Sequence, residues 1–494
     1  MYATYLMVGA IRWLTQCLQS DDEEDEDDEI QNWSYGAAEE EEGESIDRVL
    51  DDKVEDDKHV YLIKWNNKSH MHNTWETKES LAGIKGFKKL ENYIKKLAEA
   101  DRIRPHLTRE ELEGLDIERE MQREILEEHT KVERVVAVRI DDETGDTQYC
   151  CKWRGVPYDQ LTWENESLIQ GDFQKEIDDF LARQNSAMLP AHSASITTQR
   201  SKVTKLMEQP SYLVGGTLRD YQLEGLNWLA YSWMFNRNVI LADEMGLGKT
   251  CQSVSFISYL VHTHKIFGPY LVVVPLSTIN AWANEFKRWA PDLNMIMYIG
   301  SRESRETLRD YEFYGTKGNT RQPRFNVLLT TFEIVLKDAD ILRGLKWSLL
   351  VVDEAHRLKN SESLLHDVLK DFSTANRLLV TGTPLQNSMR ELWSLLSFLM
   401  PNKFRSVEEF EATYKDLQEE GHLEKLHEEL RPHLLRRIKK DVEKSLPSKT
   451  ERCVWMNNFC FLLLIIGFVV FCVLACRPSS SKCPSGLWRA TMLR

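Results

Sequence analysis

Cysteine is scarce in this chain, with nine residues in 494 and no CxxC pair among them. Small secreted domains that depend on disulfides are much richer in cysteine, so a disulfide framework is excluded as the basis of the fold. The close histidine pairs, His70 with His72 and His262 with His264, have no cysteines at zinc-finger spacing, which excludes a zinc finger. We therefore expect a reduced protein inside the cell.

Basic residues are absent from two runs near the start, Asp21–Glu29 and Glu39–Glu44, which together hold fourteen acidic residues. These runs account for nearly all of the formal net charge of −15, so the acidity does not exclude nucleic acid as a partner. Residues 1–44 are predicted to form a disordered acidic tail without a secretory signal. The alternative is an acidic segment that competes with DNA for a basic groove or binds histones.

Charge is also absent from Phe459–Cys476, an apolar run of 18 residues that reaches the lower length limit of a transmembrane helix. Nothing before this run has the pattern of a membrane protein. A hydrophobic fraction of 42% excludes a wholly disordered chain. The length predicts about three or four domains.

Short apolar runs recur between residues 239 and 383, each ending in polar or small residues, with helical stretches such as Thr250–Val261 between them. Parallel strands that are covered on both faces need such near-continuous apolar runs. The alternation predicts an α/β parallel sheet that binds its ligand at the carboxyl ends of the strands. The predicted strands are Val239–Ala242, Leu271–Val274, Val327–Leu329, Leu349–Val352 and Leu378–Val380.

A glycine-rich segment with the sequence DEMGLGKT lies between a predicted strand and a predicted helix. Gly246 and Gly248 let backbone N–H groups close on phosphate oxygens at a helix N-terminus. Lys249 can reach the β- and γ-phosphates, and Thr250 can hold Mg²⁺. The first residue is aspartate where the strict GxxxxGK[ST] pattern has glycine, and a chance glycine turn is the alternative interpretation. The predicted nucleotide-binding residues are Asp243, Glu244, Met245, Gly246, Leu247, Gly248, Lys249 and Thr250.

An acidic pair ends the apolar run LLVVDEAH. Asp353 is placed to hold Mg²⁺, and Glu354 is placed to polarise the attacking water as a general base. Such a pair can be an ordinary solvated strand end. That interpretation loses force here because the pair follows a phosphate loop on the same kind of sheet.

The order DEMGLGKT, VVVPLST, TTFE, DEAHRLKN, TGTPLQN resembles the first motor lobe of the Snf-type chromatin-remodelling ATPases of helicase superfamily two, over about Leu218 to Arg437. The resemblance implies a RecA-like lobe, a DNA-dependent ATP hydrolase, in which Lys249, Asp353 and Glu354 are catalytic and Gln222 reads the adenine edge. It also implies DNA-backbone contacts by Pro275, Leu276, Ser277, Thr278, Thr330 and Thr331, and coupling of nucleotide state to lobe movement by His356, Thr381, Gly382, Thr383 and Pro384.

Two segments before this lobe share one layout, which indicates an internal duplication. VYLIKW, NTWE and a helix in the first correspond to QYCCKW, LTWE and a helix in the second, with equivalent tryptophans 88 residues apart. Each resembles a chromodomain, a small α+β module. Two of them before a Snf-type motor resemble the chromodomain–helicase–DNA-binding remodelers, in the subfamily of the single-subunit nucleosome-spacing enzyme. That family implies nucleosomes and histone tails as partners, a nuclear location and a monomer.

Methyl-lysine recognition by these modules requires an aromatic cage. Trp65 matches one cage position by resemblance and is the candidate for a histone-tail contact, but Lys68 stands where typical readers have a second aromatic residue. Trp75 and Trp163 are predicted to be core residues. We therefore favour gating of the motor cleft over histone reading.

The resemblance stops near Arg452, where a second motor lobe with arginine fingers is expected, and no QxxDRxxRIGQ-like motif follows. The basic residues Arg436, Arg437, Lys439 and Lys440 are either interlobe residues or solvated charges. Three interpretations of the apolar tail remain open: an alternative transcript end, a membrane anchor, or a core or partner-binding helix. No membrane partner is favoured, and we expect a truncated isoform that binds Mg·ATP and DNA or histones but hydrolyses poorly. The alternative is an inactive chromatin adaptor or competitor.

The predicted division of the chain is a tail at 1–44, chromodomains at 45–100 and 131–190, a helical connector at 101–130, a linker at 191–216, the ATP-binding lobe at 217–436, the start of a second lobe at 437–452 and a non-family apolar tail at 453–494.

Overall fold

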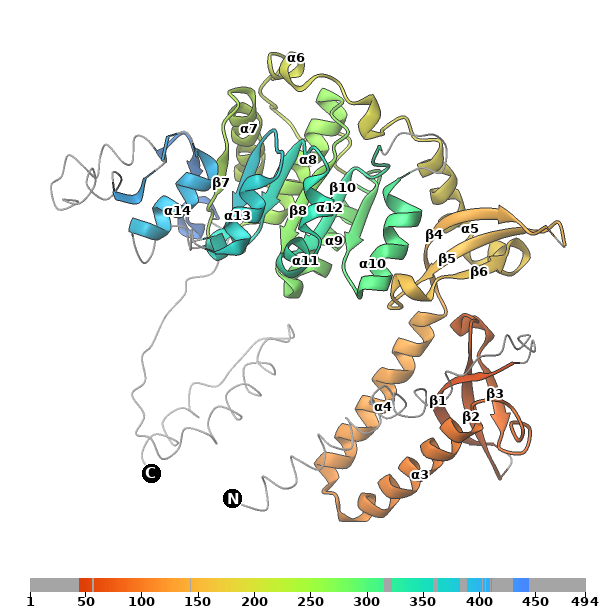
Figure 1. The fold of residues 1–494 in the computed structure, drawn as a ribbon. Coiled ribbons are helices and arrows are strands. Elements are labelled where there is room, and N and C mark those ends of the chain that lie inside the picture. Colours follow the sequence, from red (N-terminus) through yellow and green to blue (C-terminus); the bar gives the residue numbers. More distant parts are fainter. Residues whose placement is uncertain are drawn as a thin grey trace, which may run out of the picture. The chain divides into compact units, whose positions relative to one another are not determined.

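The computed structural model describes residues 44–55, 57–142, 144–314, 322–358, 363–382, 389–401, 403–404, 406–408, 410 and 430–443 (Figure 1). The chain divides into two units, Met1–Lys439 and Lys440–Arg494, and the fold below is that of the first. The predicted acidic tail, apart from Glu44, and the apolar run Phe459–Cys476 lie outside the described residues. Within the described ranges, no helix is both long and apolar enough to span a membrane.

The first module is a three-stranded antiparallel sheet of β1 (Ile46–Glu55), β2 (Lys58–Trp65) and β3 (Thr74–Thr77). Helix α3 (Phe87–Ile103) packs on it through its apolar side and closes a small core. Apolar residues of both strands, such as Val49, Tyr61 and Ile63, face this core, and the charged residues Asp51 and Lys64 are buried beside them.

The second module repeats this plan with β4 (Val132–Ile140), β5 (Thr147–Trp153), β6 (Thr162–Asn165) and α5 (Glu166–Gln184). The first strand of each module has two register irregularities at equivalent positions. The predicted duplication is therefore confirmed at the level of strand pairing, and both modules have the predicted α+β plan.

Helix α4 (Arg109–His129) connects the modules and begins with a capping box of Thr108 and Glu111. Its Arg119 and Arg123 form ion pairs with Asp51 of β1, at 3.0 and 2.6 Å, which fixes the helix on the first module. The turn His70–His72 meets the second module, where His72 Nε2 lies 2.9 Å from Glu164 Oε2.

The lobe is built on a parallel sheet in the order β13–β7–β12–β11–β8–β10–β9. All five strands predicted from apolar runs are present, and the predicted α/β sheet is confirmed. The bounds are β7 (Val239–Leu241), β8 (Tyr270–Val274), β9 (Met295–Tyr298), β10 (Val327–Thr331), β11 (Leu349–Val352), β12 (Arg377–Val380) and β13 (Leu434–Leu435). The central strands are fully buried, as continuous apolar sequence requires.

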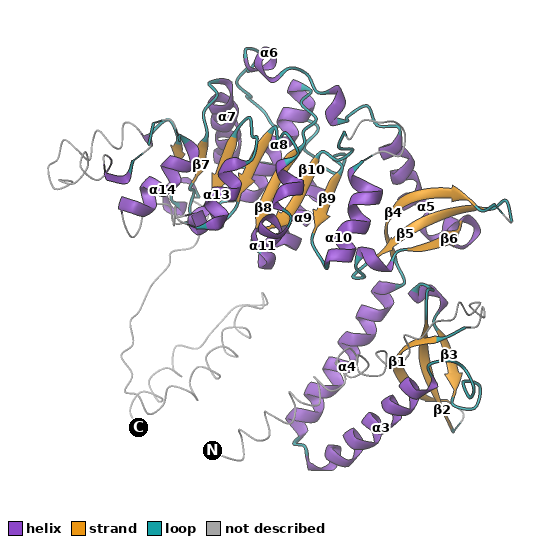
Figure 2. Ribbon diagram, in the orientation of Figure 1, coloured by secondary structure: helices purple, strands orange, loops and turns teal. Residues whose placement is uncertain are grey.

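Helices cover both faces of this sheet (Figure 2). One core layer packs the helices α7 (Asp220–Met234), α8 (Lys249–His264) and α9 (Ile279–Trp289) against the sheet. The other face carries α11 (Phe332–Lys337), α12 (Ala339–Arg343), α13 (Leu364–Asp371) and α14 (Met389–Leu399). Shorter helices of this unit are α6 (Ile196–Arg200) and α10 (Arg302–Leu308), and α17 (Lys439–Val442) begins at its last residue.

Candidate functional site

The phosphate-loop candidate runs from the end of β7 to the start of α8. Gly246 and Gly248 have φ angles of 86° and 78°, in the left-handed region that glycine adopts without strain. Gly248 is the residue that precedes the first turn of α8, so the loop presents its backbone N–H groups at a helix N-terminus. Such an end carries partial positive charge and binds anions.

Lys249 begins α8, and its Nζ donates a hydrogen bond of 2.9 Å to the carbonyl oxygen of Asp243. Burial lowers the pKa of Lys249, and the nearby carboxylates of Glu354 and Asp353 oppose that effect. The lysine and the acid pair lie at the same edge of the sheet, because they follow the parallel strands β7 and β11. Thr250 follows in the first turn of α8.

Asp353 follows β11 and is held by two hydrogen bonds. The indole Nε1 of Trp282 donates to Oδ2 at 2.7 Å, and the backbone N–H of Glu354 donates to Oδ1 at 2.9 Å. Burial raises the pKa of Asp353 above its usual value, while the two donors pull it down. Trp282 was not found from the sequence, because a tryptophan on an amphipathic helix reads as ordinary core.

Glu354 has a φ of 45°, which is uncommon for a residue with a side chain and marks local strain. Its Oε2 lies 3.0 Å from Nδ1 of His356, in the short helical turn Ala355–Leu358 that follows. His356 is exposed, so the strained turn places the carboxylate of Glu354 and the imidazole of His356 together at the solvent side of the sheet edge.

Gln222 comes from α7 and packs against the phosphate loop. Its Nε2 donates to the carbonyl oxygen of Leu247 at 3.2 Å, and its Oε1 accepts from the backbone N–H of Arg219 at 3.0 Å. A Cβ at Gly248 would lie 2.4 Å from Gln222 Nε2, so the loop passes this side chain closely. The assignment of Gln222 to the adenine edge stays a prediction.

Oxygen donors dominate the site, which suits Mg²⁺. The hydroxyl of Thr250 and the carboxylates of Asp353 and Glu354 are the ligand types that this ion prefers, and it usually keeps several waters beside phosphate oxygens. Within the described ranges, no three His, Cys, Asp or Glu side chains cluster closely enough to hold a metal without such help.

The residues expected to contact DNA divide into two groups. Pro275, Leu276, Ser277 and Thr278 form a short turn after β8, and Leu276 is 66% exposed. Thr330 and Thr331 end β10 and are buried, and Thr330 Oγ1 donates to the carbonyl oxygen of Tyr298 at 2.8 Å. The first group is accessible to a ligand, whereas the hydroxyl of Thr330 already has an internal partner.

The residues expected to couple nucleotide state to movement are described only in part. Thr381 follows β12, and Gly382 lies against the phosphate loop, because a Cβ there would be 2.8 Å from Met245 Cγ. Thr383 and Pro384 lie outside the described residues.

The tryptophans of the modules require a correction. Trp65, the cage candidate, is 5% exposed and donates from Nε1 to Thr74 Oγ1 at 3.1 Å, so it is a core residue with almost no ring surface for a ligand. Trp75, predicted to be core, is 38% exposed, and Lys53 Nζ lies 4.4 Å from its ring centroid. Trp65 ends β2 in a run of three buried residues, whereas β3, which carries Trp75, has no buried residue.

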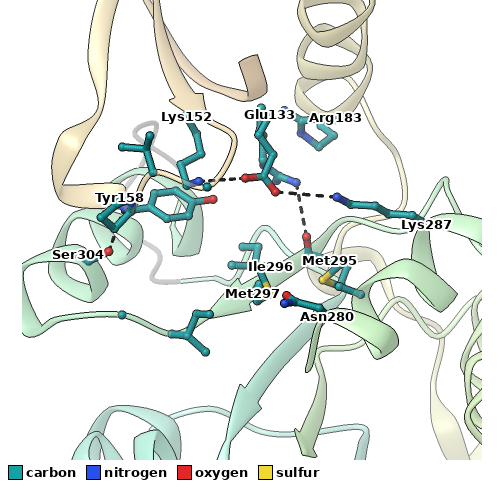
Figure 3. A pocket seen from close by; sticks show the side chains of 17 residues that line it. Glu133, Lys152, Tyr158, Arg183, Asn280, Lys287, Met295, Ile296, Met297 and Ser304 are labelled. Atoms are coloured by element: carbon teal, nitrogen blue, oxygen red, sulfur yellow. Dashed lines mark hydrogen bonds and ion pairs between the residues drawn. The ribbon is translucent and has the colours of Figure 1, made fainter. Parts of the chain in front are cut away.

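A buried ion pair joins the second module to the lobe. Arg134 of β4 donates from Nε to Glu312 Oε1 at 2.6 Å and from Nη2 to Asn294 Oδ1 at 2.6 Å. A cavity of about 480 Å³ opens beside it (Figure 3), where Tyr158 of the module donates its backbone N–H to Ser304 Oγ. No sequence pattern marks Arg134, because charged residues on short strands are common.

Two protein-family models match the parts of the chain described above. The SNF2-related domain family matches residues 221–458, and the chromo (chromatin organisation modifier) domain family matches residues 45–96 and 130–183. "Protein CHROMATIN REMODELING 5" of Arabidopsis thaliana is 50% identical over 416 residues, which are 82% of this chain and 24% of that protein.

Animal relatives give the same result. "Chromodomain-helicase-DNA-binding protein 1" of Gallus gallus and that of Homo sapiens are each 48% identical over 403 residues, covering 80% of this chain and 23% of the relative. The chain thus spans about a quarter of the length of these proteins. A solved structure, the Sulfolobus solfataricus SWI2/SNF2 ATPase core in complex with dsDNA, is 28% identical, covers 50% of this chain and 49% of its own, and has a TM-score of 0.42.

Proposed function

Because this chain belongs to the chromodomain–helicase–DNA-binding family of chromatin remodelers, we propose that its lobe binds Mg·ATP between the loop Asp243–Thr250 and the pair Asp353–Glu354. One observation carries this proposal. Lys249 follows β7 and both carboxylates follow β11, so the parallel sheet brings residues about a hundred positions apart in sequence to the same edge. The family is an SNF2 ATPase family, so the reaction is ATP hydrolysis.

Each side chain has a separate task in this proposal. The loop N–H groups and Lys249 bind the β- and γ-phosphates, with the lysine leaving the carbonyl oxygen of Asp243 to do so. Thr250 and Asp353 would hold the metal, and Glu354 would accept a proton from the attacking water. Mg²⁺, when bound, neutralises charge on the phosphate oxygens. Gln222 recognises the base.

The wider activity that we propose is ATP-driven translocation of double-stranded DNA on nucleosomes, in the nucleus. The exposed turn Pro275–Thr278 supports a role in contacting the DNA backbone. Affinity based on phosphate contacts falls steeply with salt. Thr381–Pro384 and His356 are proposed to couple the nucleotide to movement, and the domain boundaries predicted from the sequence belong to this proposal.

We propose that the lobe binds Mg·ATP through its own residues and that fast turnover depends on a second lobe. In this family's mechanism, arginines of a second lobe stabilise the transferring phosphate, an effect of about 10³–10⁵ in other nucleotide hydrolases.

Lys249→Ala and Glu354→Gln test the site when Mg·ATP binding and hydrolysis are measured with and without nucleosomes. Lys249→Ala is expected to abolish binding. Glu354→Gln should keep binding while lowering any turnover by about 10²–10⁴-fold, the usual contribution of a general base. Lys337→Ala, at the exposed end of α11, is the control. Turnover that survives Lys249→Ala would refute the phosphate-loop assignment.

A second candidate is a chromatin-binding adaptor without catalysis. It is favoured by the two complete modules, one of which is joined to the lobe by the buried pair Arg134–Glu312. Histone-tail peptides in a pull-down separate the two functions, because an adaptor retains its peptides when Lys249→Ala has removed nucleotide binding. The burial of Trp65 argues against methyl-lysine specificity in such binding.

A further inference from the structure

The segment that leaves the last strand of the lobe runs along the phosphate loop. β13 pairs in parallel with β7 through Leu434 and Leu435. The pairing continues past both strands, because the N–H of Ala242 donates to the carbonyl oxygen of Leu435 and the N–H of Glu244 donates to that of Arg437, at 2.7 and 2.9 Å. Residues 434–437 are therefore fixed beside the loop by backbone hydrogen bonds.

Arg437 forms a buried ion pair with Asp243, the first residue of the loop, and this pair is called the clasp below. Its backbone N–H and its Nε each donate to Asp243 Oδ1 at 3.0 Å, and its Nη2 donates to Asp243 Oδ2. The Asp243 side chain is fully buried, so this bidentate pair has one geometry.

The clasp reaches two helices as well. Nη1 of Arg437 donates to the carbonyl oxygen of Tyr221 in α7, and Nη2 donates to Gln252 Oε1 in α8 at 2.8 Å. Gln252 in turn donates to Asp243 Oδ2 at 3.2 Å. A single arginine thus ties the departing segment to α7, to the first residue of the loop and to α8.

These contacts of Arg437 place Lys439, two residues further on, beside the phosphate loop. Its backbone N–H donates to Glu244 Oε2 at 2.7 Å. Its Nζ lies over the loop glycine, because a Cβ built on Gly246 would be 3.0 Å from that nitrogen. Lys249 and Lys439 thus both place an ammonium group at this loop, Lys249 on the carbonyl oxygen of Asp243 and Lys439 over Gly246. Two ammonium groups repel each other, and an anion between them removes the repulsion.

We propose that Lys439 is a second phosphate-binding lysine of the nucleotide site and that the Arg437–Asp243 clasp is the positioning device that puts it there. The inference rests on the proposed binding of Mg·ATP and deepens it. A triphosphate held by both lysines would also hold the departing segment, so nucleotide occupancy would restrain the chain at the point where it leaves the lobe. The four basic residues of this segment therefore have different roles. Arg437 positions Lys439, and Lys439 binds the phosphates. Arg436 and Lys440 are exposed.

The first test measures affinity of the full chain for Mg·ATP and for inorganic tripolyphosphate by calorimetric titration. Lys439→Ala is expected to weaken both by about tenfold, the loss of one charge-assisted contact. Lys439→Arg should stay within about threefold of the parent, and Lys440→Ala, the matched neighbour, should be unchanged. If Lys439→Ala binds like Lys440→Ala while Lys249→Ala does not bind, the inference is wrong and the proposed function stands. If the parent chain binds neither probe, both fail.

The second test follows hydrogen exchange of the backbone amides of residues 434–443. Mg·ATP should slow exchange of this peptide in the parent and in Lys440→Ala, but not in Lys439→Ala. Arg437→Gln should weaken Mg·ATP binding, and adding Lys439→Ala to it should cause little further loss, because the lysine is no longer positioned. Fully additive losses, or unchanged exchange in the parent, would overturn the coupling. The Lys439 variants and the exchange data decide the question even if Arg437→Gln does not fold.

Discussion

The indole of Trp282 and the carboxylate of Asp353 form a buried hydrogen bond of 2.7 Å between α9 and the end of β11. The contact orients one oxygen of Asp353 inward, and its other oxygen accepts the N–H of Glu354. Asp353, the acid proposed to hold the metal, is thus held in position by a hydrogen bond from helix α9.

Trp282→Phe should shift the pH dependence of Mg·ATP binding. Removing the donor raises the pKa of Asp353 further above its ordinary value, so binding that needs the carboxylate is lost at a higher pH. The stability loss should be about 1.5–3 kcal/mol at pH 7. The pKa of Asp353 is higher in the folded chain than in the unfolded chain. The stability loss caused by Trp282→Phe is therefore present above the folded pKa, where Asp353 is ionised. It disappears at low pH, where Asp353 is protonated in both the folded and the unfolded chain.

Trp289→Phe, on the same helix and also buried, is the control for loss of an indole. It should leave the pH midpoint of Mg·ATP binding unchanged. Equal midpoints for the parent and Trp282→Phe would show that the hydrogen bond does not tune the acid.

The sheet and its loop were predictable because they depend on local sequence. Each central strand is a continuous apolar run, and the glycines of the loop meet a backbone requirement that few residues satisfy. β9 and β13 were missed: β9 alternates buried and half-buried residues, and β13 has only two residues and exists because its backbone pairs with β7. Contacts between distant segments, such as Arg437 with Asp243 or Arg134 with Glu312, leave no periodic trace in a sequence.

The two tryptophans of the first module should behave in opposite ways. Trp65→Ala is expected to destabilise the chain by about 3–5 kcal/mol, because it removes a buried ring and leaves a cavity. Trp75→Ala should cost only about 1 kcal/mol, since it loses a half-exposed ring and its contact with Lys53. Denaturant unfolding followed by hydrogen exchange within residues 45–96 measures both. A larger loss for Trp75→Ala would restore the first assignment of these residues.

Breaking the junction between the second module and the lobe should be costly. Arg134→Ala leaves Glu312 buried without its partner, which is worth about 3–5 kcal/mol in such pairs. The double variant Arg134→Met with Glu312→Leu should recover most of that stability, because an apolar pair of similar size needs no counter-charge. Thermal unfolding compares them. If the two variants are equally destabilised, the pair is not a buried ion pair in solution.

Gly225→Ala probes how tightly the clasp is packed. A Cβ at Gly225 in α7 would lie 1.9 Å from Gln252 Oε1 and 2.9 Å from Arg437 Nη2, so Gln252 has to move and its hydrogen bonds to Asp243 and Arg437 break. We expect a stability loss of about 1–3 kcal/mol, as for other overpacked cores, together with weaker Mg·ATP binding.

Gly114→Ala is the matched control, because this glycine also lies within a helix, α4, and a Cβ there meets nothing within 4 Å. It should gain roughly 0.5–1 kcal/mol from helix propensity alone and leave Mg·ATP binding unchanged. Thermal unfolding and nucleotide titration of the two variants separate the effects of packing from those of propensity. A Gly225→Ala chain that binds Mg·ATP as tightly as Gly114→Ala would mean that the clasp does not position the phosphate loop.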